Sequence, residues 1–168
     1  MYAYGFRNVQ GLAWHASGAL LATEHGPTAL PNEAGRFGLD EPNVVRVGVN
    51  DGWPHLAGHG SEPRFNAPLA VWISAIAPAG IAASGDTLYI GALRGRQLRR
   101  IEVDVLADLP EAITVGCGDA LFPGAFGQVR AVRGHPDGSI DFTTSNRDGR
   151  GGPADGDDNV LRIGVVTP

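Results

Sequence analysis

The sequence predicts an all-β chain that forms part of a β-propeller, with about three blades in a single domain over residues 1–168. Three observations lead to this fold class. Glycine (25 residues) and proline (12 residues) both exceed average usage, which favours turn-rich β structure over helices. Three segments repeat the order strand, glycine-containing turn, strand, loop and strand. The units recur at a spacing of roughly 50 to 70 residues, which is typical of propeller blades.

Each unit has two strands joined by a tight turn and a third strand after a loop. The turns contain Gly18, Gly85 and Gly138, which tolerate the positive φ angles that such turns need. The third strands alternate apolar and polar residues, as a half-exposed outer strand should. Segment 106–109 is at most a turn. The expected strands lie within 10–24 and over 43–49 in the first unit, over 80–83, 87–93 and 97–103 in the second, and over 129–133, 139–144 and 159–165 in the third.

Three blades do not close a ring, because propellers typically need about four to eight. Three arrangements therefore remain open. The chain could be one half of a larger propeller, it could close a ring with a second copy, or its third strands could pack as a compact β-sandwich. Bare blade faces and sheet edges invite pairing with another chain, so we expect possible self-association or assembly with an N-terminal half.

The composition excludes several classes of protein. A hydrophobic content of 43% argues against intrinsic disorder. The net charge of −5 and the lack of any basic run argue against nucleic acid as a partner. No apolar run approaches the roughly twenty residues of a membrane span, and no signal peptide is visible at the N-terminus. The single cysteine, Cys117, excludes an internal disulfide.

Polar residues flank the first predicted hairpin on both sides. Arg7, Asn8 and Gln10 accompany the start of its first strand, and segment 24–27 (Glu-His-Gly-Pro) follows its second. In an antiparallel hairpin the start of strand one and the end of strand two lie at the same end. We therefore expect these two clusters to meet and to form the candidate site.

Three long connections, 26–42, 52–69 and 147–158, are the segments where functional residues should concentrate. The first and third leave from equivalent strand ends, so they should lie on one face. The third contains four aspartates between 148 and 158. Their spacing does not match an EF-hand, which needs a glutamate at its twelfth position, so a solvated turn is the better prediction than a calcium loop.

Segments 7–14 and 23–27 resemble the soluble pyrroloquinoline quinone (PQQ)-dependent aldose and glucose dehydrogenases, the glucose/sorbosone dehydrogenase family. Four further stretches, 50–54, 76–80, 91–95 and 144–151, agree in order, so the resemblance covers nearly the whole chain. It implies a six-bladed propeller of which this chain is the C-terminal half. Because family members are usually exported, it also implies a periplasmic or extracellular location.

The resemblance implies a site for PQQ and Ca²⁺. At positions matching Gly26 and Pro27 the family binds Ca²⁺ through backbone carbonyls, a ligand type that this hard cation prefers. The family commonly has lysine where Arg94 stands, and it has an arginine at the position of Gln128, which weakens the predicted anchoring of the cofactor carboxylates. The residues that would hold PQQ are Arg7, Asn8, Gln10, Arg94 and Arg130.

The activity implied is oxidation of an aldose sugar to its lactone, with PQQ as the hydride acceptor. The family's catalytic histidine comes from the N-terminal half, so we predict little or no activity for this chain alone. His15, His25, His55 and His59 are interpreted as structural or solvated. Two alternatives stay open. One is a non-catalytic fragment for sugar binding or assembly, and the other is a metal-dependent lactonase that would use Glu24 and Asn146.

Overall fold

The computed structural model describes residues 1–33, 36–60, 62–106 and 112–164. Its strands form three antiparallel sheets in which each strand pairs with the next one along the chain. One short 3₁₀ helix, η1 (Pro31–Glu33), lies in the first long loop. The sheets consist of β1 (Val9–Trp14), β2 (Leu20–Glu24) and β3 (Glu41–Val45); β4 (Pro78–Ser84), β5 (Thr87–Ala92), β6 (Gln97–Val105) and β7 (Ile113–Leu121); and β8 (Val129–Gly134), β9 (Ile140–Thr144) and β10 (Val160–Ile163).

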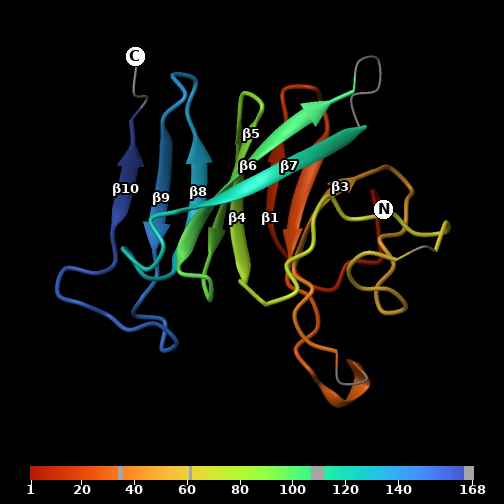
Figure 1. Ribbon diagram of the computed structural model, residues 1–168, viewed down its shortest axis with the longest axis horizontal. Helices are drawn as coiled ribbons and strands as arrows, with labels where there is room; N and C mark the ends of the chain where they lie inside the picture. Colours follow the sequence, from red (N-terminus) through yellow and green to blue (C-terminus); the bar gives the residue numbers. More distant parts are fainter. Residues whose placement is uncertain (34–35, 61, 107–111, 165–168) are drawn as a thin grey trace.

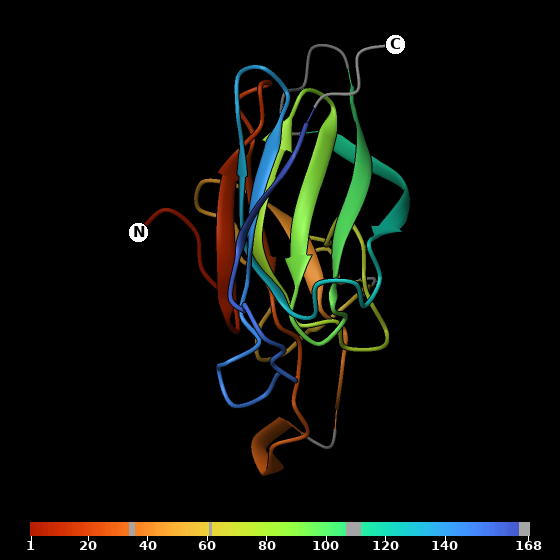
Figure 2. The same ribbon diagram turned by 90° about the vertical axis from the view of Figure 1, so that its left-hand side faces the viewer.

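The three sheets stand side by side as three blades of a propeller, which confirms the predicted fold class (Figures 1 and 2). The first strand of the middle blade, β4, contacts both β1 and β8, the first strands of its two neighbours. No helix among the described residues is long and apolar enough to cross a membrane.

Several element boundaries differ from the prediction by one or two residues, and two differences are larger. The strand expected over 43–49 begins earlier, at Glu41, and ends at Val45. The middle blade gains a fourth strand, β7, that the sequence pattern did not indicate. Residues 107–109 of the predicted turn and Val165 at the end of the last predicted strand lie outside the described residues.

The hydrophobic core lies between adjacent blades. One cluster joins blade one to blade two and includes Leu21, Val44, Leu88 and Ile90, each buried to 1% exposure or less. A smaller cluster joins blade two to blade three and consists of Leu98, Val129 and Phe142. Burying a side chain of this size stabilises a fold by roughly 1.5–3 kcal/mol, so these contacts hold the blades against one another.

Glycines in the first strands let neighbouring blades approach backbone to backbone. A Cβ atom on Gly11 of β1 would lie 2.6 Å from the Ala79 carbonyl oxygen of β4. A Cβ on Gly80 would lie 2.9 Å from both the Arg130 carbonyl oxygen and the Val132 nitrogen of β8. The hydroxyl of Thr23 also donates a 2.6 Å hydrogen bond to Ala79 O. Only glycine fits where two backbones come this close.

The turns between the first and second strands of the blades lie at one end of the sheets, and two of the long loops lie at the other end, together with the short β5–β6 turn. Figure 1 shows segments 25–33 and 36–40 of blade one and loop 145–159 of blade three extending beyond the same, lower ends of the strands, and Figure 2 agrees. The structure therefore places the first and third long connections on one face, as the sequence predicts.

A pair of carboxylates is buried between β2 and β3. Glu24 and Glu41 stand opposite each other in the strand register and are 4% and 7% exposed. The Asn43 amide donates to both side chains, at 3.2 and 3.4 Å, and the Gly58 amide donates to Glu41 at 3.0 Å. Burial, followed by the neighbouring charge of Glu24, raises the pKa of Glu41 to about 8. Burial likewise raises the pKa of nearby Asp51 to about 6.

The contact between blades two and three predicts a cost for Gly80→Ala. The new methyl group would press on the β8 backbone, which cannot move as a flexible side chain would, so we expect a loss of about 1–3 kcal/mol in the free energy of unfolding. Gly116→Ala is the matched control in strand β7, because its Cβ would reach only Glu102 Cβ at 4.0 Å. Urea denaturation measures both variants; equal stabilities would contradict the close contact.

The raised pKa of Glu41 predicts that stability falls as pH rises. The folded chain keeps a proton on Glu41 up to about pH 8, whereas an unperturbed glutamate loses it near 4.5. Unfolding therefore releases a proton between these values, so the free energy of unfolding decreases with pH in this window. Glu41→Gln mimics the protonated side chain and should flatten the decrease in urea midpoint between pH 5 and 8. The exposed control Glu102→Gln should leave the slope unchanged; an equally steep slope in Glu41→Gln would contradict the assignment.

Candidate functional site

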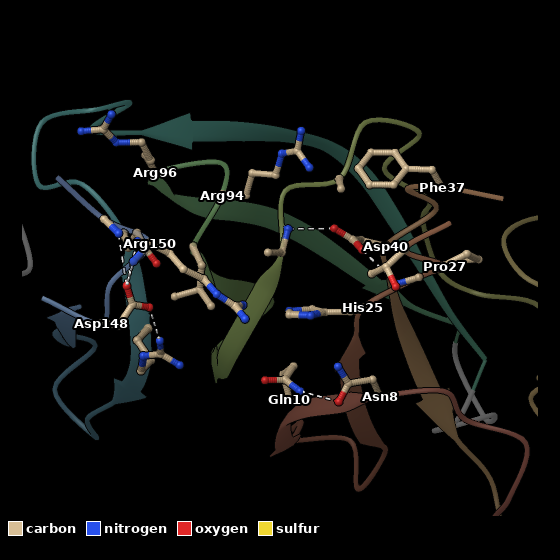
Figure 3. Close-up of a pocket in the computed structure, with 18 of the residues that line it drawn as sticks. Asn8, Gln10, His25, Pro27, Phe37, Asp40, Arg94, Arg96, Asp148 and Arg150 are labelled. Carbon is tan, nitrogen blue, oxygen red and sulfur yellow. Dashed lines mark hydrogen bonds and ion pairs between the residues drawn. The ribbon is translucent and has the colours of Figure 1, made fainter. Parts of the chain in front are cut away.

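The loop-bearing ends of the three blades surround one open cavity of about 620 Å³ (Figure 3). Every blade contributes residues to its wall. The polar and charged lining residues are Asn8, Gln10, His25, Thr28 and Asp40 from blade one, Arg94 and Arg96 from the β5–β6 loop of blade two, and Gln128, Arg130, Asp148 and Arg150 from blade three.

The two ends of the first hairpin meet at this cavity, which confirms the prediction made from the hairpin register. The His25 amide donates a 3.1 Å hydrogen bond to the Asn8 carbonyl. One carboxylate oxygen of Glu24 accepts from the amides of Arg7 and Asn8, at 2.8 and 3.3 Å. The side chains of Asn8 and Gln10 both line the cavity and are joined by a 2.7 Å hydrogen bond from the Gln10 amide.

Arg7 lies beside the cavity rather than in its wall. Its guanidinium is bound to the buried carboxylate of Glu33 at 2.7 Å and to the Thr28 hydroxyl at 2.9 Å, and it stacks on the Trp53 ring at 5.5 Å. Burial alone would raise the pKa of Glu33, but hydrogen bonds from Arg7 and two backbone amides outweigh it and lower the pKa to about 2. Arg7 therefore stabilises the 25–28 turn from outside the cavity. The structure does not bring its guanidinium together with the other predicted PQQ residues.

Gly26 and Pro27 line the cavity and are fixed by a buried aspartate. Asp40 accepts the Gly26 amide at 2.9 Å through one oxygen and the amides of Ile76 and Ala77, both at 2.8 Å, through the other. The Pro27 carbonyl accepts the Gly38 amide at 3.1 Å, which leaves it a second lone pair. Within residues 1–33, 36–60, 62–106 and 112–164, no hydrogen bond to the Gly26 carbonyl is found.

The remaining predicted residues, Arg94 and Arg130, lie on different blades and both line the cavity. The Arg94 guanidinium lies over the Phe37 ring, 5.2 Å from its centroid. The Arg130 guanidinium donates to Asp148 at 3.0 Å and to the Ser145 hydroxyl at 2.9 Å. Gln128, the position where the resembled family has an arginine, donates to the other oxygen of Asp148 at 3.3 Å.

The cavity has an excess of positive charge although the chain carries a net charge of −5. Four arginines and two aspartates line the cavity. In one of these aspartates, Asp40, both carboxylate oxygens accept hydrogen bonds from backbone amides. In the part of the chain that the structure describes, the guanidinium groups of Arg94, Arg96 and Arg150 make no ion pair. Unpaired guanidinium groups around one cavity suit an anionic ligand, above all one with carboxylates.

Two residues that position the site were missed from the sequence. Asp40 lies directly before β3. A single aspartate in a loop gives no sequence signal that its side chain will accept hydrogen bonds from three backbone amides. Asp148 lies in the loop that was predicted to be a solvated turn. The loop is mostly exposed, as a solvated turn would be. Within it, Asp148 accepts hydrogen bonds from Gln128, Arg130 and the amides of Arg150 and Gly151. These contacts, led by the Arg150 amide, lower the pKa of Asp148.

The histidines and the two candidate lactonase residues differ in their position relative to the cavity. Of the described histidines, His25 alone lines the cavity, and its Nε2 bonds to the Pro78 carbonyl at 2.8 Å. Glu24 and Asn146 do not line it. Both bind backbone groups, since Glu24 accepts two amides and Asn146 joins Gln128 N to Phe126 O. The described residues contain no group of three or more His, Cys, Asp or Glu side chains arranged to hold a metal ion.

Solved structures share this fold at substantial sequence identity. A protein from Thermus thermophilus described as a glucose dehydrogenase is 41% identical with a TM-score of 0.86, and the match covers 96% of this chain and 46% of that one. The PQQ-bound form of aldose sugar dehydrogenase from Streptomyces coelicolor is 34% identical with a TM-score of 0.81, covering 96% of this chain and 44% of that one. The chain thus spans a little under half the length of these structures.

Relatives and a family profile agree with these structures. Quinoprotein glucose dehydrogenase B from Acinetobacter calcoaceticus is 41% identical over 65 residues, which cover 39% of this chain and 12% of that protein. An uncharacterized protein from Synechocystis is 30% identical over 171 residues, covering 89% of this chain and 37% of its own length. The profile described as "Glucose / Sorbosone dehydrogenase" matches residues 1–153. The chain therefore belongs to the glucose/sorbosone dehydrogenase family.

Proposed function

We propose that this chain is the cofactor-binding half of a PQQ- and calcium-dependent dehydrogenase that oxidises an aldose sugar to its lactone. The observation that carries the proposal is the cavity shared by three blades, with its four arginines. PQQ is a flat orthoquinone with three carboxylates, so its binding needs several fixed donors and at least one guanidinium fork. The PQQ-bound relative from Streptomyces coelicolor supports this choice of ligand.

The residues present fit the cofactor. Arg94 and Arg130 would bind carboxylates from two adjacent blades, and the side chains of Asn8 and Gln10 would donate from blade one. Arg7 would act indirectly in this arrangement, by holding the 25–28 turn through Glu33 and Thr28. Each of these donors is fixed by a neighbour in the protein, so little side-chain entropy remains to be lost when a ligand binds.

The same cavity offers backbone oxygens for calcium. The carbonyls of Gly26 and Pro27 would be the protein ligands, since Ca²⁺ accepts carbonyl oxygen and Asp40 already fixes this turn. Water and the cofactor would complete the coordination, because the described residues supply no cluster of acidic ligands there. When bound together, the quinone and the ion supply a hydride acceptor and a Lewis acid.

The proton acceptor for the sugar hydroxyl is proposed to lie outside this chain, in an N-terminal half. His25 is held by its Nε2 contact with Pro78, which fixes the ring and gives it a structural role. We therefore propose that the isolated chain binds the cofactor but turns over little or no sugar. Turnover by the isolated chain that His25→Asn abolishes would assign the base to His25 instead.

Assembly and export belong to the same proposal. Leu12 and Trp14 on β1 are about 60% exposed, and Val160 on β10 is 74% exposed, so apolar surface lies on both outer blades. These residues would contact the missing blades or a second copy, which light scattering at micromolar concentrations tests.

The single-domain extent over 1–168 and a periplasmic or extracellular location also remain proposals, and fractionation of cells that express the full reading frame tests the location.

The proposal predicts calcium-dependent PQQ binding that needs Arg130. Absorbance titration should show PQQ binding with calcium and a large loss of it with chelator. Arg130→Ala should weaken binding about tenfold, or ~1.4 kcal/mol, because it removes a charge-assisted hydrogen bond. Arg133→Ala is the matched control, an exposed arginine of the same strand that does not line the cavity.

Two results would contradict the cofactor assignment. Negligible binding both with and without calcium would leave a fragment for sugar binding or assembly. Equal weakening by Arg130→Ala and Arg133→Ala would mean that PQQ binds through general electrostatic attraction and not in this cavity.

A further inference from the structure

We infer that Arg150 is an anion-binding residue of the cavity and that Asp148 positions it. This inference rests on the proposed function in naming a polycarboxylate as the ligand. Arg150 lies on the β9–β10 loop, beside Asp148 in the cavity wall (Figure 3). The resembled family has an arginine at the position of Gln128, and Arg150 would supply the positive charge that is absent there.

The charge balance of blade three singles out Arg150. Arg130 is paired with Asp148, 3.0 Å away, so much of its charge is already compensated. Gln128 contributes a neutral amide to the same carboxylate. Across the described ranges, no carboxylate pairs with the Arg150 guanidinium, whose side chain is exposed at the cavity. Of the two blade-three arginines that line the cavity, Arg150 is therefore the one without a carboxylate partner among the described residues.

The loop around Arg150 is held in one shape by backbone contacts. Asp148 Oδ1 accepts the Arg150 amide at 2.9 Å and the Gly151 amide at 3.2 Å. A Cβ on Gly151 would collide with the carbonyl oxygen of Asn146, so the chain passes too close to the segment that follows β9 for any side chain there. At the far end of the loop, Asp158 accepts the Asn146 amide at 2.6 Å. These contacts keep residue 150 at the cavity before a ligand arrives.

Asp148 remains ionised over the pH range in which the cavity would work, because its backbone contacts lower its pKa. Its charge attracts Arg130, while its oxygens hold the Arg150 backbone. The two roles can be separated by mutation. Asparagine keeps an oxygen acceptor for the amides but removes the charge that compensates Arg130, whereas alanine removes both.

The test uses a simple planar anion as well as the cofactor. Isothermal titration calorimetry with benzene-1,3,5-tricarboxylate, in calcium-free buffer at low salt, measures anion binding without any redox chemistry. Arg150→Gln should weaken the affinity about tenfold, the equivalent of one charge-assisted hydrogen bond. Arg133→Gln, the exposed control on β8, should change it less than twofold. Thermal melting of each variant checks that the fold is kept.

The Asp148 variants test positioning. Asp148→Asn should bind the tricarboxylate at least as tightly as the parent chain, because the cavity becomes more positive while the loop contacts persist. Asp148→Ala should bind it more weakly. A purely structural role for Asp148 would weaken binding in both variants, and that result would overturn the positioning role.

The outcomes distinguish this inference from the proposed function. If the tricarboxylate binds and its binding depends on Arg150, but PQQ does not bind, the proposed cofactor is contradicted and the anion site at Arg150 is supported. If Arg150→Gln changes neither the affinity for PQQ nor the affinity for the tricarboxylate, the inference about Arg150 is overturned and the proposed function is unaffected. Failure of the parent chain to bind either anion would overturn both.

Discussion

The close contact between the first strands of neighbouring blades is the constraint on which the rest of the structure depends. Gly11 lets β1 approach Ala79, and Gly80 lets β4 approach Arg130. Because the blades pack backbone to backbone there, the loop-bearing ends of all three sheets come together around one cavity. The interblade hydrophobic clusters stabilise this arrangement. The glycines determine how near the loops of different blades lie.

Carboxylate acceptors hold these loops in a fixed arrangement. Glu24 binds the amides before β1, Asp40 binds the Gly26 turn to the β3–β4 connection, and Asp148 holds the Arg150 turn. Each of these side chains joins segments far apart in sequence, so the cavity wall is set by hydrogen bonds rather than by loop length. Asp148 compensates part of the charge of Arg130, whereas Arg94, Arg96 and Arg150 make no ion pair among the described residues and keep their positive field for a ligand.

The sequence predicts those features that depend on local pattern. The hairpin register placed Asn8 beside His25, and turn glycines such as Gly18 marked the units correctly. Strand β7 was missed because Gly116 and Gly118 interrupt its apolar alternation. The position of Arg7 could not be predicted, because its partner Glu33 lies 26 residues away and competes with any ligand for the guanidinium. The cavity arginines other than Arg94 and Arg130 were missed because exposed arginines in loops usually carry no structural signal.

Amide hydrogen exchange followed by mass spectrometry, with and without PQQ and calcium, would show most directly whether three blades share one ligand. Binding in the cavity should slow exchange together in the segments around residues 25–28, 93–97, 128–131 and 148–152, which belong to different blades and line the same wall. Exchange in the β1–β2 turn at Gly18, at the far end of the blades, should not change. Protection confined to one blade, or none at all, would show that the cavity is not the cofactor site.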